Sequence, residues 1–577
     1  MFSKLLTRTT STSNTCCLLL RSSSNAVIKN SQSLISSATT QTRHFTSNNK
    51  ENSTLAQTVE TDNSTNQTAG CPYHQNVANT IKEIKPWNQV PGPKPWPLIG
   101  NLIDIKKNAF NPSGYFLSLC DTYGDLVKLT VFGTNMLIIA NPYVLSELFK
   151  KEDRRKLLES TRYYKEPRGL VLSPVELRLD EDWNSIRQLF NIAMRPEFQE
   201  NITIPQLTEL NGEFLRRLVA NMKHVPQSDK YQLLNTVDTT SRYAFDAVLK
   251  VFLGVKMTDD IAKSLPFEIR DFVKYSVSVL DMAIMLDHKP PFYRLYKTKE
   301  FKEFETYYDK SYEFARYCIQ RFKTNPSEKE RLLELLENRA KDQDQANARI
   351  ESVMINFLQA GIDITVRILC HCLYRLAHHP EYQEKIYKES VEIFGEPTIE
   401  EMTSENGLVI AKEHYKKLKL TKNFVEEVLR LNSFSYLTMG RQLSQDTEIG
   451  GYTVPKDTII IAMQRWATMK DEYVPRGEEF IPERHEKGSP LAPVNNFVSI
   501  PFGVGARKCP GSRIASTELY FGIINAVRHF KLSHENPEVL PPTSFDQSLL
   551  YIDSKKNPLY FTPREHVKEF VEKNAKL

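Results

Sequence analysis

The chain has 577 residues, of which 40% are hydrophobic and 25% are charged, with a net charge of +5. These proportions are typical of a globular protein and exclude a fibrous or largely disordered chain. No uninterrupted apolar run approaches the roughly 18 residues that a membrane-spanning helix needs. The eight cysteines are scattered without the regular spacing of a disulfide scaffold, so we expect a reducing or neutral compartment.

The N-terminal segment 1–45 holds five basic residues, no Asp or Glu, and many Ser and Thr, which is the composition of a mitochondrial transit peptide. Those five residues account for the whole net charge, and Arg43-His44-Phe45 resembles a matrix-processing site. A disordered tail and a secretory signal are the alternatives, and the apolar stretch 16–20 is too short for the second. We predict a transit peptide over 1–45 and a polar, flexible lead-in over 46–84.

Order is expected from about residue 85. The proline-rich segment 91–101 cannot be helical, because proline lacks the N–H donor and fixes φ. Clustered and alternating apolar residues predict strands over 125–131 and 135–139. From 141 to 435 the pattern is mostly helical, with apolar residues at a spacing of 3.6 around 206–222, 298–323 and 345–375.

The last quarter of the chain mixes strands with one helix. Segment 451–458 is interpreted as a turn between strands, and 459–463 as an apolar strand. A helix is predicted over 514–529, and short strands over 530–562. With no clear linker inside 85–577, one large domain is expected.

The most informative segment is 501–511, with the sequence PFGVGARKCPG. It places Cys509 beside two cations and just before the helix predicted over 514–529. Positive charge and the N–H groups of a helix N-terminus both lower the pKa of a thiol, so these surroundings favour a thiolate. Gly505 and Gly511 are expected to adopt backbone conformations closed to other residues. For Cys509 alone, a buried structural cysteine is the alternative.

The full spacing from Phe502 through Arg507 and Cys509 to Gly511 resembles the haem-binding loop of the cytochromes P-450, in which a cysteine thiolate is the axial ligand. The resemblance covers 85–577 and implies the fold of that family: mainly α-helical with a smaller β portion, in a single large domain. It implies haem b as the cofactor, with the iron held by Cys509 and the ring contacted by Phe502 and Gly511.

A bound haem needs its two propionates neutralised. Trp183 and Arg187 are suited to this, because a spacing of four places them on one helix face and both can donate to a carboxylate. Taken alone, such a pair is usually a packed anchor beside a solvated charge. In a chain that resembles this family it matches the propionate-binding pair, and Arg441 and Arg507 match two further basic positions.

The oxygen side is expected at 360–365, inside a long apolar helix. Ala360 and Gly361 are small enough for haem and oxygen to approach the backbone. Asp363 is an ionisable residue in an apolar stretch, and the resemblance implies that it delivers protons to reduced oxygen. An ion pair or a helix cap is the alternative for this residue.

The family places a threonine directly after this acid, whereas this chain has Ile364 there and Thr365 displaced by about 100° around the helix axis. Three outcomes stay open. Thr365 acts with Asp363 through a distorted helix, a substrate hydroxyl or water replaces the alcohol, or the enzyme rearranges substrates without activating oxygen. Further departures are Asn432-Ser433, where His-Pro is common, and Ser512, where arginine often stands in mitochondrial members.

Two charged groups complete the resemblance. Glu427 and Arg430, which elsewhere would be an ordinary surface pair, are implied to form a buried ion triad with Arg484 that holds the haem loop. A basic cluster near this helix is implied to dock an acidic ferredoxin, with a solvated face as the alternative. Its members are Lys416, Lys417, Lys419 and Lys422. The family's second lysine on that helix falls on Glu426.

The resemblance implies a mitochondrial-type monooxygenase that inserts one atom of O2 into a lipophilic substrate, sterol-like or foreign. Its electrons would come from NADPH through a ferredoxin reductase and a ferredoxin. Two alternatives stay open: an isomerase or dehydratase of the same fold that does not use O2, and a haem- or lipid-binding protein without turnover.

The expected pocket walls are 433–439, the apolar face of the oxygen-side helix, and 275–296. Within the last of these, the apolar runs 277–280 and 284–286 are expected to contact the inner mitochondrial membrane from the matrix side. No nucleic acid partner is expected.

Overall fold

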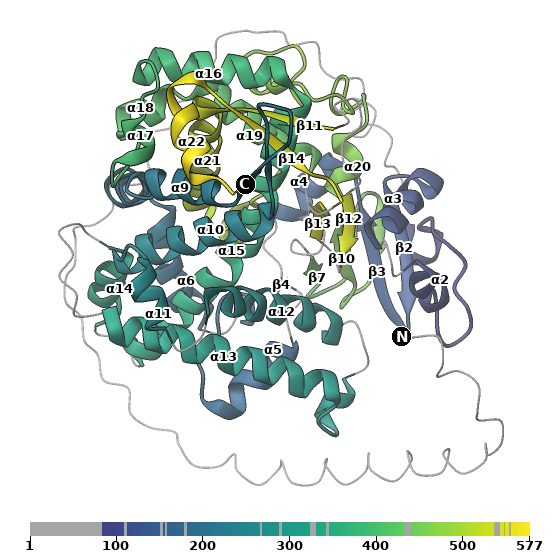
Figure 1. The fold of residues 1–577 in the computed structure, drawn as a ribbon. Coiled ribbons are helices and arrows are strands. Elements are labelled where there is room, and N and C mark those ends of the chain that lie inside the picture. Colours follow the sequence, from purple (N-terminus) through teal and green to yellow (C-terminus); the bar gives the residue numbers. More distant parts are fainter. Residues whose placement is uncertain are drawn as a thin grey trace, which may run out of the picture. The chain divides into compact units, whose positions relative to one another are not determined.

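A long helix, α15 (Ala346–His378), runs through the middle of the described part of the molecule and organises it (Figure 1). The computed structural model describes residues 84–576 apart from short gaps at 109–111, 151–153, 156–158, 178–181, 266–267, 288–290, 323–330, 342–344, 433–439, 536–542, 547–548 and 553–555. The predicted transit peptide, nearly all of the lead-in and the pocket wall 433–439 therefore lie outside the described residues.

Most residues of α15 are buried, because other helices surround it. These neighbours include α10 (Thr236–Leu253), α12 (Ile269–Asp287), α13 (Lys299–Phe322) and α21 (Ser512–His529). Among the described residues, α15 is the helix long and apolar enough to cross a membrane, and 67% of its apolar window is buried inside the protein, as in the core helix of a soluble protein. Its hydrophobicity therefore follows from its central position.

The remaining helices complete the α-helical part, and several begin or end at residues that favour those positions. The cap of α10 is an example: the Asn235 side chain accepts a hydrogen bond from the backbone N–H of Asp238, and the helix ends at Gly254 with a φ of 71°. The other α-helices are α2 (Leu102–Lys107), α3 (Pro112–Tyr123), α4 (Pro142–Lys150), α5 (Glu159–Lys165), α6 (Trp183–Phe190), α7 (Pro196–Phe198), α8 (Ile204–Thr208), α9 (Asn211–Ala220), α11 (Asp259–Lys263), α14 (Leu332–Ala340), α16 (Pro380–Phe394), α17 (Glu400–Thr403), α18 (Lys412–Lys417), α19 (Lys419–Leu431), α20 (Gln464–Thr468) and α22 (Lys568–Asn574).

The strands form small sheets. In the largest described sheet, with the order β2-β3-β10-β7-β4, strand β2 (Leu126–Val131) pairs antiparallel with β3 (Thr134–Ile139), and β10 (Ile459–Ala462) pairs parallel with β3. The other strands are β1 (Lys85–Pro86), β4 (Arg154–Arg155), β5 (Met222–His224), β6 (Tyr231–Leu233), β7 (Arg441–Gln442), β8 (Thr447–Ile449), β9 (Tyr452–Val454), β11 (Phe530–His534), β12 (Thr543–Asp546), β13 (Leu549–Ile552) and β14 (Leu559–Pro563).

The structure confirms the predicted fold class and most long elements. The helices expected around 298–323 and 345–375 are α13 and α15, and 206–222 is divided between α8 and α9. The segment 451–458 is only partly a turn, because its residues Tyr452–Val454 form β9, which pairs with β8 and β1. The described residues of 84–576 form one compact unit, with a main hydrophobic core around α15 and smaller cores beside the sheet of β2 and β3.

Candidate functional site

The loop that holds Cys509 leads directly into α21. The Cys509 amide donates a hydrogen bond to the carbonyl of Phe502 at 2.8 Å, and this bond closes the loop around the short 3-10 helix η7 (Gly505–Arg507). Phe502 is half-buried and packs against the main core. Cys509 therefore lies at a fixed position three residues before the first residue of a long, buried helix.

Two glycines give this loop its curvature, but they are not quite the predicted pair. Gly503 and Gly505 have positive φ angles of 68° and 65°, which L side chains rarely adopt. Gly511 has a φ of −85°, so the expectation of an unusual backbone there is wrong. A Cβ at Gly511 would lie 3.8 Å from the Phe357 ring and 4.0 Å from Cys509 Sγ, which are ordinary contact distances. These contacts place Phe357 of α15 close to the cysteine.

Cys509 differs from the other described cysteines in its surroundings. Cys120, Cys318, Cys370 and Cys372 are buried, and burial raises the pKa of Cys120 to about 12 and that of Cys370 to about 11. The pKa values of Cys318 and Cys372 are also raised by burial. A thiol that stays protonated is a poor metal ligand. Among the described cysteines, Cys509 alone is partly exposed.

Trp183, Arg187 and Arg507 come together beside this loop, although they are distant in sequence. The guanidinium of Arg507 lies 5.0 Å from the Trp183 ring and that of Arg187 lies 5.9 Å from it. Arg187 donates to the carbonyl of Lys508, and Arg507 donates to the carbonyl of Pro174 at 2.9 Å. Two cations and one indole thus meet next to Cys509.

The indole N–H of Trp183 tests whether this cluster fits a haem. Trp183 is 4% exposed, and its Nε1 finds no hydrogen-bond acceptor among the described residues. A buried donor without an acceptor is costly, which favours an acceptor supplied by a ligand. The propionates of haem are anionic acceptors of this kind, so the residues present fit the group.

Arg441 occupies a different element from these three residues. It lies in β7, opposite Ile460 of β10, and its guanidinium is 5.0 Å from the Phe149 ring. It is buried and donates to the carbonyl of Gly440 at 3.2 Å. The structure thus places Arg441 at the sheet, next to the undescribed segment 433–439.

The oxygen-side residues lie on α15 as predicted, and one face of the helix is open there. Ala360 is exposed and Ile364 is half-buried, although most of their neighbours on the helix are buried. The two differ by about 40° around the axis, so they belong to one face. Gly361 points elsewhere: a Cβ there would lie 3.1 Å from Cγ2 of Val248 on α10. The small size of Gly361 therefore serves the packing of α10 against α15.

Asp363 forms an ion pair, as the alternative interpretation of this residue expected, with a partner that the sequence reasoning did not identify. Nε of Arg367 donates to Asp363 Oδ1 at 2.9 Å, and both side chains are largely buried. The i,i+4 spacing of the two residues was the signal that could have identified this ion pair. Thr365 is buried about 160° away from Asp363 around the axis, and α15 is a continuous α-helix through this point. The distorted helix that would bring Thr365 next to Asp363 is therefore absent from this described segment.

The predicted ion triad is confirmed and is completely buried. Glu427 accepts from Arg430 Nε and Nη2 at 2.8 Å and from Arg484 Nε at 2.9 Å. His485, which the prediction omitted, lies with its Nε2 2.9 Å from Oε2 of Glu427. Burial opposes the charge of Glu427, but the hydrogen bonds from Arg430 and His485 outweigh it and lower its pKa to about 2. The triad joins α19 to the 3-10 helix η6 (Pro482–His485).

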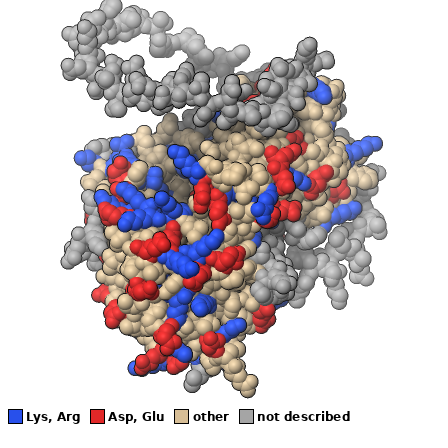
Figure 2. Space-filling view, turned by 90° about the horizontal axis from the view of Figure 1, so that it is seen from above, with Lys and Arg blue, Asp and Glu red and all other residues tan. Residues whose placement is uncertain are grey.

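The basic cluster is partly neutralised by its neighbours. Lys416, Lys417 and Lys419 are exposed, and Lys416 pairs with Glu200 at 2.8 Å. Lys422 is half-buried, and its ammonium donates to the carbonyl of Tyr415 at 2.8 Å. Figure 2, seen from above the view of Figure 1, shows Lys and Arg side chains in groups beside Asp and Glu over this face. Burial raises the pKa of Glu426, although His485 and Lys508 counteract this effect.

The apolar runs expected to contact a membrane lie on α12. Val279 and Leu286 of α12 are buried, so the expectation that these runs face a membrane is wrong for these two residues. In the same region, exposed apolar side chains follow α12, where Leu295 is 82% exposed and Phe292 and Tyr296 are also exposed. The sequence feature that could have predicted the exposure of these three residues was their position in the connection between two helices.

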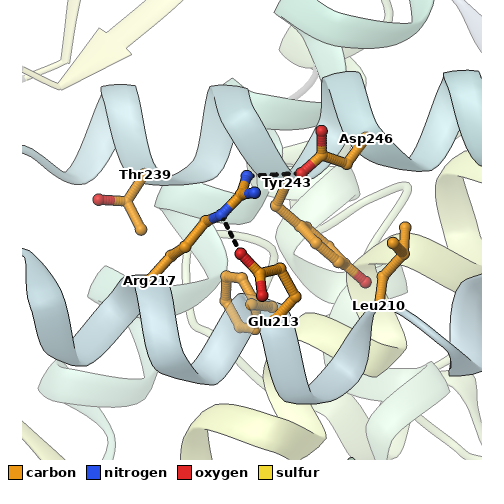
Figure 3. A pocket seen from close by; sticks show the side chains of 7 residues that line it. Leu210, Glu213, Arg217, Thr239, Tyr243 and Asp246 are labelled. Carbon is orange, nitrogen blue, oxygen red and sulfur yellow. Dashed lines mark hydrogen bonds and ion pairs between the residues drawn. The ribbon is translucent and has the colours of Figure 1, made fainter. Parts of the chain in front are cut away.

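A small cleft elsewhere in the molecule does not involve the predicted site. It lies between α9 and α10, where Arg217 reaches Glu213 at 2.6 Å and Asp246 at 2.6 Å (Figure 3). Its polar lining is satisfied by these ion pairs, and none of the predicted site residues lines it.

Comparisons with known proteins agree with the geometry of the site. A model of the family "Cytochrome P450" matches residues 90–560. Cytochrome P450 10 of Lymnaea stagnalis is 25% identical over 86% of this chain and 91% of that protein. Cytochrome P450 27C1 of Danio rerio is 25% identical over 80% and 83%, and "Probable cytochrome P450 12b2, mitochondrial" of Drosophila melanogaster is 29% identical over 61% and 65%.

The family model covers most of the chain, and the described residues form the mainly α-helical fold with small sheets that the family has. Members of the family are monooxygenases that use haem with a cysteine thiolate as axial ligand. The chain belongs to the cytochrome P450 family and is a haem-thiolate monooxygenase.

Proposed function

We propose that this cytochrome P450 inserts one oxygen atom from O2 into a lipophilic substrate, sterol-like or foreign, with electrons from NADPH through a ferredoxin reductase and a ferredoxin. Three observations support this redox route. One similar protein is named mitochondrial, segment 1–45 has the composition of a transit peptide, and Lys416, Lys417 and Lys419 are exposed. Opposite charges on two proteins speed their encounter.

The convergence of Trp183, Arg187 and Arg507 beside the Cys509 loop carries the proposal. When bound, haem supplies the redox chemistry that activates O2. Cys509 would hold the iron, Trp183 and the two arginines would hold the propionates, and the buried triad would keep the loop in place. Phe502, Gly511 and the open face at Ala360 would border the ring, with Gly361 keeping the helix close to α10.

On the oxygen side, we assign proton delivery to Asp363. Its carboxylate is held by Arg367, on a helix whose neighbouring face at Ala360 is open. Thr365, the predicted alcohol, is buried on another face, so water or a substrate hydroxyl would take its part. Arg441 would approach the haem from the sheet, beside the expected pocket wall 433–439.

An isomerase or dehydratase reaction is the second candidate, and Ile364 is the observation that favours it. Its apolar side chain, half-buried on the open face, stands where the family places an alcohol. Such an enzyme would convert an already oxidised substrate without NADPH.

We further propose that the protein resides on the matrix side of the inner mitochondrial membrane. The exposed side chains of Phe292, Leu295 and Tyr296 support a peripheral contact, because they present apolar surface between α12 and α13. A substrate dissolved in the bilayer would then enter from this side.

The first experiment tests the thiolate ligand. The reduced carbon monoxide complex of the purified protein is expected to show the thiolate-type absorption band, and Cys509→Ser is expected to lose it. Cys120→Ser replaces a buried cysteine near the sheet of β2 and β3. It serves as the control and is expected to keep the band. Loss of the band in both variants, or in neither, would contradict the assignment of Cys509.

The second experiment separates the two reactions. Spectral shifts on binding first select ligands from a panel of sterols and fatty acids. Each ligand is then incubated with NADPH, ferredoxin reductase and ferredoxin. A hydroxylated product supports the monooxygenase. Conversion of a peroxide substrate without NADPH, with no hydroxylation in the full system, would overturn it in favour of the second candidate.

A further inference from the structure

A column of polar side chains runs along the core helix α15 on one side of the open face. Asp363, Arg367 and His371 follow one another at a spacing of four residues, which places them on one face of the helix. At the far end of the column, Nδ2 of Asn432, the residue that ends α19, lies 3.2 Å from Nδ1 of His371. We call these four residues the polar column.

Burial makes the polar column unusual. His371 and Asn432 are 4% and 5% exposed, and Asp363 is buried as well. Charged and polar groups in an apolar core are unfavourable unless they are paired, so each member requires a partner. Arg367 donates to Asp363 at 2.9 Å, and Asn432 bonds His371. The column is therefore a built set of contacts and not a solvated face.

The contact at Asn432 bears on the charge of His371. The Nδ2 atom of an amide only donates, so Nδ1 of His371 accepts and the imidazole is neutral in this arrangement. A protonated imidazole one turn from Arg367 would place two like charges at i,i+4, which is unfavourable. A neutral His371 thus adds no positive charge beside the ion pair of Arg367 with Asp363.

The polar column joins two departures of this chain from its family. Asn432 stands where histidine is common, and Ile364 stands where threonine is usual. Asn432 contacts His371, which lies on α15, the same helix that carries Ile364. Ala360 and Ile364 lie within about 100° of Asp363 around the axis, so the acid end of the column borders the open face.

We propose that Arg367 and His371 are positioning residues: Arg367 holds the Asp363 carboxylate toward the oxygen side, and His371, bonded to Asn432, places no competing charge beside Arg367. This inference rests on the proposed monooxygenase function. That reaction consumes O2, one substrate C–H bond, two electrons and two protons, and gives one hydroxyl group and one water. Arg367 stays protonated throughout and orients the carboxylate, while the protons pass through Asp363.

The test compares two largely buried arginines, each with an i,i+4 ion pair. Arg367→Met breaks the pair with Asp363, and Arg217→Met breaks the pairs with Glu213 and Asp246 in the cleft of Figure 3. The two guanidinium side chains are 15% and 18% exposed. Both variants are expected to unfold at a lower temperature. Only Arg367→Met is expected to release more hydrogen peroxide per NADPH, with product formation about tenfold slower or more.

A spectroscopic measurement extends the test to protein that does not turn over. The infrared stretching frequency of carbon monoxide on the reduced protein responds to charge on the oxygen side. We expect it to shift in Arg367→Met and Asp363→Asn and to stay unchanged in Arg217→Met. Asn432→Asp, which favours a protonated His371 and so changes the charge beside Arg367, should also shift it. Arg367→Lys, which keeps the charge, should restore much of the frequency and of the coupling.

The outcomes separate this inference from the function on which it rests. If Arg367→Met, Arg367→Lys and Asn432→Asp all keep the unmodified frequency and the unmodified peroxide yield, the polar column is only a structural element and the inference is overturned. If the unmodified protein forms no hydroxylated product with any ligand, the proposed function fails, while the infrared shifts still decide whether the column acts on the oxygen side.

Discussion

At the scale of single residues, two side chains of the same type can differ in hydrogen bonding because their surroundings differ. Trp183 and Trp466 are both tryptophans next to cations, but Trp466 Nε1 donates to Asp121 at 2.8 Å on the surface. The N–H of Trp183 is buried and has no acceptor in the described structure. The N–H of Trp466 thus has its acceptor within the protein, whereas the N–H of Trp183 is suited to an acceptor supplied by a ligand.

This contrast predicts the effect of removing each indole N–H. Trp183→Phe keeps an aromatic ring but loses the donor, and hydrogen bonds to charged groups contribute about 1.5–3 kcal/mol. Haem should therefore be lost faster to an acceptor protein such as apomyoglobin. Trp466→Phe should lose haem at the unmodified rate. Equal rates in both variants would argue against a propionate contact at Trp183.

Glu427 offers a second prediction at this scale. Replacing it by glutamine leaves two buried guanidinium groups without their counter-charge, so the free energy of unfolding should fall by about 3–5 kcal/mol. The surface carboxylate of Glu479, paired with Arg476, is the matched control, and its replacement should leave stability nearly unchanged. Urea denaturation followed by circular dichroism measures both. A loss of under about 1 kcal/mol for Glu427→Gln would contradict a structural role of the triad.

The sequence was sufficient for residues that lie in short, dense motifs and insufficient for residues whose role depends on distant neighbours. Cys509, Glu427, Arg430 and Arg484 could be identified because their motifs resemble those of the family. The φ angle of Gly511 could not, because it depends on how the loop closes through Cys509 and Phe502. The contact of Asn432 with His371 joins two helices, so no local pattern predicts it.

At the scale of elements, long helices were predictable because their apolar periodicity repeats over many turns. Strands β5 and β6 were missed inside a region expected to be helical. Each has three residues, and β6 is stabilised by pairing with β14, more than 300 residues away. Tertiary pairing of this kind leaves little trace in the local sequence.

The contact between α10 and α15 predicts the outcome of a substitution in each helix. Gly361→Ala should raise helix propensity by about 1 kcal/mol, but its Cβ would press on Val248 at a cost of about 1–3 kcal/mol. We expect the single variant to be destabilised or neutral. In the background Val248→Ala, the same change should be stabilising by about 1 kcal/mol. Thermal unfolding of the four proteins measures this, and an identical effect in both backgrounds would refute the packing argument.

At the scale of the whole molecule, stability should depend on pH in two steps. Burial lowers the pKa of His529, and lowers that of His566 to about 4, from an ordinary value of 6.5. The native state therefore favours neutral histidines, and this stabilisation, fully present above pH 6.5, is lost as the pH falls toward 4. Hydrogen bonds from Arg528 and His529 overcome burial and lower the pKa of Glu401 to about 2, like that of Glu427. Their stabilisation, fully present above about pH 4.5, is lost between pH 4.5 and 2.

Denaturation measured at a series of pH values tests this sequence of events. His566→Gln should flatten the step between pH 6.5 and 4 and leave the acid step in place. Glu427→Gln should flatten the acid step and leave the first. If either variant keeps both steps unchanged, the corresponding group does not set the pH dependence.

The unbroken length of α15 has a consequence for how the protein moves. Its 33 residues span about 50 Å, and helices contact it along much of that distance. Backbone amides in its buried middle should exchange their hydrogens with solvent only when the whole domain unfolds. Movements that admit a substrate must therefore come from elements at the periphery, such as α12 and the exposed turn at Leu295, while α15 stays fixed. The oxygen-side residues are thus held by the least mobile helix, whereas substrate entry depends on movements of other elements.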